Sequence, residues 1–125
     1  MIRTLLTVLV LSLLSTPVLG EWTKVGESVK GTVYVDFERI RKHGGYVYYW
    51  YLTDLLKPDK DGDLSAKIYR QGDCKLFRHK ILSGSYHKEP MGGGTGITNN
   101  DPDKNWTYPS PNSSNETILK SVCSR

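Results

Sequence analysis

The sequence predicts an α+β fold: a single antiparallel β-sheet of about five or six strands with a C-terminal helix tied to it by a disulfide. An aromatic and β-branched run over 45–55 and a two-residue alternation over 64–69 indicate strands. Residues 113–123 have the capping residues and apolar spacing of a helix. The chain has two cysteines, Cys74 and Cys123, so one intramolecular pairing is available.

The first 20 residues have the parts of an export signal. Arg3 precedes an apolar run over 5–14, and Val18 and Gly20 suit the small-residue pockets of a signal peptidase. The run is too short to cross a bilayer, and no second long apolar run follows it. We therefore expect cleavage after Gly20 and a mature protein that does not span the membrane.

Removal of the signal peptide, 1–20, leaves one domain of 105 residues, 21–125. No cysteine lies near the cleavage site, so a lipid anchor is not expected and the exported protein should be periplasmic or secreted. This oxidising location favours a disulfide between Cys74 and Cys123, which should contribute about 4 kcal/mol by closing the chain.

Charge argues against one large class of partners. Without Arg3 the mature chain has 16 basic and 13 acidic residues, a net charge of +3, with the signs interspersed. Such a surface is not typical of nucleic-acid binding. A basic excess over 75–88 fits either an outward strand face with its turn or a binding patch. For the second reading, the candidate binding residues are Arg78, Lys80, Tyr86 and Lys88.

Five strands are expected in chain order. Short strands are predicted at 22–25 and 32–36, and the stretches 46–55 and 64–73 should form a hairpin. The aromatic stretch 45–55 should be a central strand that is covered on both sides or packed against a partner. If no bulge intervenes, the alternation of the second stretch continues to Cys74 on the buried face. The last strand, 75–83, has apolar residues in both phases, so it needs a bulge or two-sided burial, and its register stays open.

The polar segment between the hairpin strands is predicted to be a turn. Its carboxylates, Asp59, Asp61 and Asp63, invite a calcium interpretation. An EF-hand loop, however, needs glycine at its sixth position and glutamate at its twelfth. Here Gly62 is fourth and Arg70 is twelfth, so the turn is favoured over a metal site.

The segment 89–105 is rich in glycine, asparagine and proline, and we predict a mobile surface loop there. A phosphate-binding loop would need a Gly-Lys-Ser/Thr ending or a strand-to-helix setting, and residues 91–96 have neither.

The C-terminal segment should be a helix of about three turns. Ser113 and Glu116 form a capping box, and the apolar stripe contains Ile118, Leu119, Val122 and Cys123. A helix this short is not stable alone in water, so its apolar stripe must pack against another part of the protein. Because Cys123 lies on this stripe and can pair with Cys74, we expect the helix to pack against the sheet.

Residues along nearly the whole mature chain together resemble the bacterial surface-adhesin protein E family. They are Trp22, Val25, Gly26, Tyr34, Val35, Asp36, Ile40, the strand 47–52 with Asp54, Gly72, Asp73, Cys74, Arg78, Tyr86, Trp106, Pro109, Val122 and Cys123. The resemblance implies a helix tied to the concave side of an antiparallel sheet, and an exported, non-enzymatic role. The type member of this family is similar to a lipid-anchored adhesin that binds host matrix and serum proteins.

Two function classes follow. The first is an adhesin-like binding protein with a protein partner, host extracellular matrix being one candidate, and with homodimerisation left open. The aromatics of 47–52 would be contact residues or, as we favour, core. The second is a soluble periplasmic factor, such as a small hydrolase or ligand carrier. It would need a pocket joining His79 or His87 with Asp73 and a serine, whereas we expect all three histidines, including His43, on the surface. We predict no catalytic residues, cofactor or metal.

Overall fold

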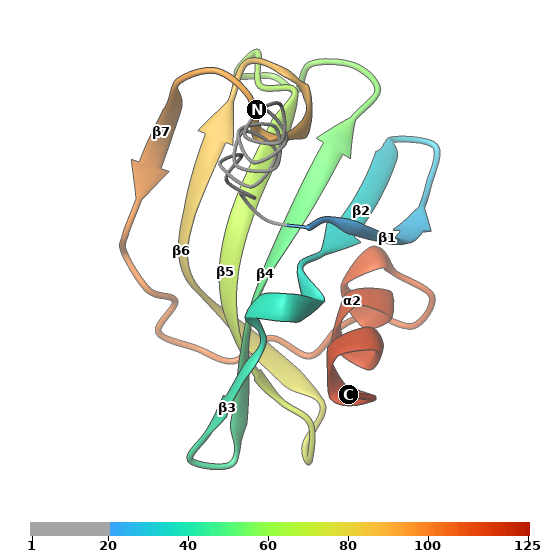
Figure 1. The fold of residues 1–125 in the computed structure, drawn as a ribbon, viewed down its shortest axis with the longest axis vertical. Coiled ribbons are helices and arrows are strands. Elements are labelled where there is room, and N and C mark those ends of the chain that lie inside the picture. Colours follow the sequence, from blue (N-terminus) through green and yellow to red (C-terminus); the bar gives the residue numbers. More distant parts are fainter. Residues whose placement is uncertain (1–20) are drawn as a thin grey trace, which may run out of the picture.

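The computed structural model describes residues 21–125, which form one antiparallel sheet of seven strands with a single α-helix against it (Figure 1). The predicted signal peptide lies outside the described residues. The strands are β1 (Thr23–Glu27), β2 (Gly31–Val35), β3 (Arg41–His43), β4 (Tyr46–Leu55), β5 (Ser65–Asp73), β6 (Arg78–His87) and β7 (Gly96–Asn99). The helices are the 3₁₀ turns η1 (Phe37–Arg39) and η2 (Pro90–Gly92) and the α-helix α2 (Ser114–Cys123). The predicted fold class is confirmed; the short strands β3 and β7 were not predicted.

Strand β4 is central, with neighbours on both edges along the order β1-β2-β4-β5-β6-β7. β2 and β3 share one edge of β4, because η1 interrupts the chain between them. The Asp36 side chain caps η1 by accepting a hydrogen bond from the backbone N–H of Glu38. The other edge of β4 pairs with β5, so the predicted hairpin is confirmed.

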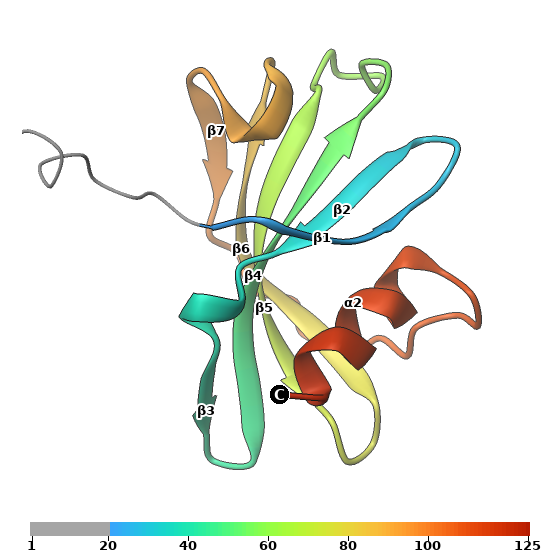
Figure 2. The same cartoon turned by 45° about the vertical axis from the view of Figure 1, so that its right-hand side comes forward.

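The core lies between α2 and the sheet face that we call the inner face. β4 alternates strictly over its first six residues, and Val47, Tyr49 and Tyr51 point inward. They pack with residues of β2, β5 and the helix, namely Val33, Val35, Ile68, Ile118, Leu119 and Val122. α2 lies on one side of the sheet, close to β1 and β2 (Figure 2). Within residues 21–125, none of the helices has the length and apolar character needed to cross a membrane.

The helix begins as the capping residues predict, with one shift. Ser113 Oγ accepts a hydrogen bond from the Glu116 N–H at 3.1 Å. The Glu116 carboxylate accepts a hydrogen bond from the N–H of Asn112 at 3.0 Å, whereas a standard capping box would use the N–H of Ser113. Because this contact satisfies an N–H just before the helix, the arrangement still fixes where the chain enters α2.

The predicted disulfide is present, with Cys74 and Cys123 49 residues apart in the sequence. The expectation that Cys74 belongs to the buried face of the strand is wrong. β5 ends at Asp73, and Cys74 is an exposed turn residue. The disulfide therefore joins the end of α2 to the β5–β6 turn, one residue beyond the sheet.

The last long strand begins later than predicted. β6 runs from Arg78 to His87, while residues 74–77 form the turn before it. The expected bulge is present: Tyr69 pairs with Ser83 and the next residue of β5 pairs with Ile81, so Leu82 is the extra residue. This insertion explains why apolar residues occupy both phases of the sequence.

The segment 89–105, predicted as a mobile surface loop, is not a loop throughout. It contains η2 and β7, and β7 adds to the edge of β6. The N–H groups of Met91 and Gly92 donate to the side chains of Asp54 and Ser65 at 2.7 and 2.8 Å. Glycine content indicated flexibility, but here glycine also provides positive φ angles and close approach to the sheet.

Candidate binding face

The face of the sheet opposite α2, here called the outer face, has a cluster of half-buried aromatic rings. Tyr46, Tyr48 and Trp50 lie in the outward phase of β4, between the core residues. Trp50 and Tyr48 both contact Tyr69 of β5, with ring centroids 5.0 and 6.4 Å apart. Tyr46 contacts Trp106 at 5.5 Å. Rings at these separations stabilise one another, and each of these residues remains partly exposed.

Trp106 reaches this face through the segment that returns from β7 to α2. Thr107 forms an antiparallel bridge with His79 of β6, with both backbone hydrogen bonds at 2.9 Å. The bridge places Trp106 beside Lys80, which points outward. The long-range pairing therefore brings a ring from residue 106 to one from residue 46.

Four cationic side chains lie over these rings. Arg39 lies 5.5 Å from the ring centroid of Trp50, and Arg41 lies 5.9 Å from that of Tyr48. On the other side of the face, the side chains of Arg78 and Lys80 lie 4.3 and 4.8 Å from the centroid of Trp106. A cation within about 6 Å of an aromatic centroid is attracted to the ring face, so these side chains are held in place before any partner arrives.

Two of the four cations are neutralised locally. Arg39 Nε pairs with the buried Asp36 carboxylate at 2.7 Å, and Arg78 Nε pairs with Asp73 at 2.9 Å. Burial alone would raise the pKa of Asp73, but the backbone N–H groups at 75 and 76 and the Arg78 guanidinium lower it overall. Within 21–125, Arg41 and Lys80 have no carboxylate partner.

The four binding residues predicted from the sequence do not converge. Arg78 and Lys80 are on the outer face. Tyr86 pairs with Ala66 in the opposite phase and lines an inner-face cavity of about 270 Å³ with Tyr51. A regular strand would place 78, 80 and 86 on one face, but the bulge at Leu82 shifts the alternation of β6 by one residue, so Tyr86 points away from the face of Arg78 and Lys80.

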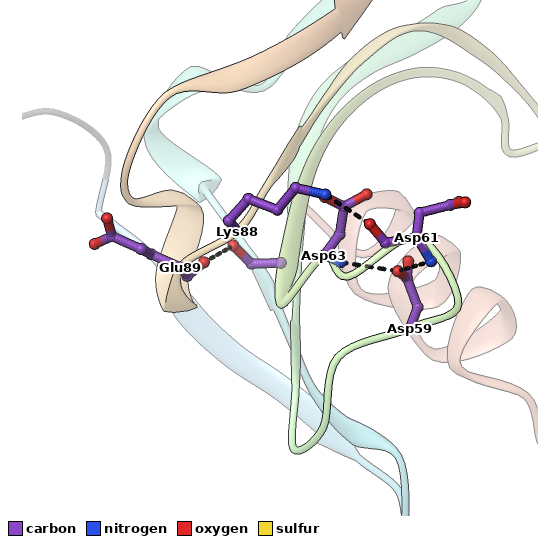
Figure 3. Close-up of polar contacts among 6 residues, drawn as sticks. Asp59, Asp61, Asp63, Lys88 and Glu89 are labelled. Carbon is purple, nitrogen blue, oxygen red and sulfur yellow. Dashed lines mark hydrogen bonds and ion pairs between the residues drawn. The ribbon is translucent and has the colours of Figure 1, made fainter.

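Lys88, the fourth residue, lies at the acidic turn (Figure 3). Its ammonium group contacts Asp63 Oδ1 at 3.0 Å and the carbonyl oxygen of Asp61 at 2.6 Å. Asp59 Oδ1 accepts hydrogen bonds from the N–H groups of Asp61 and Asp63, each at 2.9 Å. The three carboxylates approach within 4.8 Å of one another. The Asp59 carboxylate, however, accepts backbone hydrogen bonds, and the Asp63 carboxylate forms an ion pair with Lys88. The predicted turn is confirmed.

A buried arginine, Arg70, is a feature that the sequence did not reveal. It is 1 % exposed in the inward phase of β5 and lies 4.3 Å above the ring of Tyr51. Its Nη1 is 3.1 Å from Nδ1 of His79 and donates to Asn115 Oδ1 at 3.0 Å. Burial first, and then the neighbouring guanidinium, lower the pKa of His79 to about 4, so this ring is neutral at pH 7.

The histidine predictions are partly wrong. His43 is exposed as expected, but His79 and His87 are 4 % and 5 % exposed. His79 and Asp73 occupy opposite phases of the paired strands β6 and β5, so they do not share a pocket. His87 Nε2 contacts Ser85 Oγ at 2.8 Å, but its Nδ1 has no hydrogen-bond partner within 21–125. The carboxylate that orients histidine in serine hydrolases is therefore missing from this contact.

Sequence reasoning missed the aromatic cluster because both phases of β4 are aromatic. The preference for core is correct for Tyr49 and Tyr51 but wrong for Tyr48 and Trp50, which are only half-buried. α2 covers the inner face of β4, whereas on the outer face only the end of the strand near η2 is covered, where Leu52 is fully buried. No local signal separates 46, 48 and 50 from 47, 49 and 51, because the pairing of Trp50 with Tyr69 is set by the register of the folded hairpin.

The geometry defines a class of protein: a small disulfide-tied α+β domain with an aromatic and cationic sheet face. Residues 22–124 match the family model described as surface-adhesin protein E, and the chain belongs to this family. None of the curated proteins gives a significant match to the chain.

Solved structures of Haemophilus influenzae protein E share the fold. Crystal form II is 16% identical, with a TM-score of 0.64, over 87% of this chain and 91% of that chain. The selenomethionine form is 15% identical, with a TM-score of 0.63, over 87% and 90%. Protein E from a non-typeable strain is 16% identical, with a TM-score of 0.60, over 87% and 79%.

Proposed function

We propose that this protein is an exported, non-enzymatic, adhesin-like module whose outer face binds a protein partner, with host matrix or serum proteins as the first candidates. The observation that carries the proposal is the cluster of Trp50, Tyr69 and Trp106 with stacked arginines on one sheet face. Tryptophan, tyrosine and arginine are the residues most enriched among the energetic centres of protein interfaces. Membership of a family described as surface adhesin supports the same class of function.

The test is binding of the mature domain, 21–125, to a panel of purified host matrix and serum proteins. Replacing Trp50 and Trp106 together by alanine should weaken binding at least about tenfold, because each removes a large contact area. Tyr86→Ala, on the inner face, is the matched aromatic control and should bind as the wild type does. Equal loss in both variants, or no binding by the wild type to any member of the panel, would contradict the proposal.

Charge reversal separates the two parts of the predicted binding set. Lys80→Glu should weaken binding to the partner, whereas Lys88→Glu, at the acidic turn, should leave the outer face unchanged. If only Lys88→Glu matters, the acidic turn and not the outer face is the contact region.

Location distinguishes the adhesin from a soluble periplasmic factor. Fractionation of the native cells, with antibody detection on unpermeabilised cells, should find the protein outside the inner membrane and exposed at the surface or secreted. Detection in the periplasm alone would favour the alternative. Light scattering of the purified domain, compared with the tryptophan double variant, shows whether a second copy occupies the outer face.

A further inference from the structure

Four outer-face residues form one straight row across the sheet. Arg41 of β3 pairs with Tyr48 of β4, Tyr48 pairs with Gln71 of β5, and Gln71 pairs with Lys80 of β6. Adjacent strands are about 4.8 Å apart, so the backbones of Arg41 and Lys80, three strand spacings apart, are separated by about 14 Å across the sheet. The row therefore has a cation at each end and an aromatic ring and an amide between them.

Both end cations lack a carboxylate partner within the described chain and are held on rings. Arg41 lies over Tyr48 and its Nη2 is 3.4 Å from the hydroxyl of Tyr69. Lys80 lies over Trp106. Long cationic side chains lose rotamer entropy when they bind, and here the ring contacts have already restricted that freedom.

The centre of the row is polar and offers hydrogen bonds. The Gln71 amide nitrogen donates to the Tyr48 hydroxyl at 3.3 Å, and both groups keep further hydrogen-bonding capacity. A polypeptide backbone passing between the two cations would meet these groups. The neighbouring cations Arg39 and Arg78 already have their own aspartates, so among the four cations that lie over the rings only Arg41 and Lys80, at the two ends of the row, keep an unpaired charge within the described residues.

We propose that this row recognises an acidic, extended segment of the protein partner, which crosses the strands and places one carboxylate on Arg41 and one on Lys80. An extended chain advances about 3.4 Å per residue, so 14 Å corresponds to acidic residues four positions apart. This inference rests on the proposed function and adds the chemistry of the partner. Aromatic contacts supply most of the affinity, and the two cations supply orientation and selectivity.

The test begins with a library of random dodecapeptides displayed on phage and selected on the mature domain. We expect the selected sequences to contain pairs of Asp or Glu separated by three to five positions, with apolar residues around them. Synthetic copies of selected peptides should bind the Arg41→Gln, Lys80→Gln double variant about tenfold more weakly, and with less dependence on salt, than the wild type. Lys57→Gln, Lys60→Gln removes the same charge from exposed loop positions and should change neither property.

Several outcomes would overturn the inference: no selected peptides, no acidic pair among them, or equal binding by both double variants. Heparin binding that the row variant loses, in the absence of peptide binding, would assign the row to a sulfated glycan instead. Binding to host proteins that needs Trp50 and Trp106 but not the two cations would remove this inference and leave the proposed function intact.

Discussion

Acid should destabilise this protein through His79, whose ring lies against the buried guanidinium of Arg70. The nearest nitrogen atoms are 3.1 Å apart, so a protonated imidazole would place two cations together at a site with little water. The pKa of His79 falls from the usual 6.5 to about 4 on folding. At one pKa unit per 1.36 kcal/mol, this shift corresponds to at most about 3 kcal/mol of unfolding free energy.

The direction follows from where the proton binds. Above pH 6.5 the ring is neutral in both states, and its contribution does not change with pH. As the pH falls from 6.5 to 4, the imidazole of His79 is protonated in the unfolded chain but stays neutral in the folded protein. The free energy of unfolding therefore decreases over this window. Below pH 4 both states are protonated and no further loss arises from this group.

The assay is urea unfolding followed by tryptophan fluorescence at pH 7.5, 6.5, 5.5, 4.5 and 4.0. The matched variant is His79→Gln, which keeps a hydrogen-bonding side chain beside Arg70 but does not titrate. The unfolding free energy of the wild type should fall relative to that of the variant by up to about 3 kcal/mol between pH 6.5 and 4. Two parallel curves would refute the argument, because they would mean that the ring takes up its proton equally in both states.

Three further predictions concern stability. Replacing Cys74 and Cys123 by alanine should lower the unfolding free energy by about 4 kcal/mol, since the 49-residue separation sets the loop-closure entropy; a fall below about 1 kcal/mol in urea unfolding would contradict this. Deleting residues 92–96 should lower the melting temperature by several degrees, because the segment joins η2 to β7; an unchanged calorimetric transition would show that the segment is dispensable. Gly31→Ala should cost about 3 kcal/mol, because the new Cβ would lie 2.1 Å from the carbonyl oxygen of Asp54; a wild-type denaturation midpoint would mean that β2 and β4 separate easily.

The predicted elements that hold in the structure rest on local patterns. The hairpin 46–55 and 64–73 has its turn residues between two strands, and the helix has its cap at Ser113 and its apolar stripe. With two cysteines in an exported chain, the pairing was also determined. The hairpin and the helix can be inferred from residues that are close in sequence. The disulfide can be inferred because two cysteines allow only one intramolecular pair.

Two of the four cations of the candidate site could be predicted. Arg78 and Lys80 were identified from a basic run, and both are on the outer face. Arg41 and Trp106 were not, because nothing local relates them to β6. The pairing of β3 with β4 places Arg41 on the outer face, and the bridge between Thr107 and His79 places Trp106 there.

The sequence by itself determined the fold class, the hairpin, the helix and its disulfide, because hydrophobic period, turn chemistry and capping act over a few residues. Only the tertiary structure decided which aromatics of β4 face outward, since a strand with tyrosine in both phases does not indicate its core side. It also decided that Arg70 is buried, because the Tyr51 ring, His79 and Asn115 that accommodate its charge come from β4, β6 and α2. Contacts between distant elements are set by sheet register and helix docking, and these depend on the whole chain packing at once.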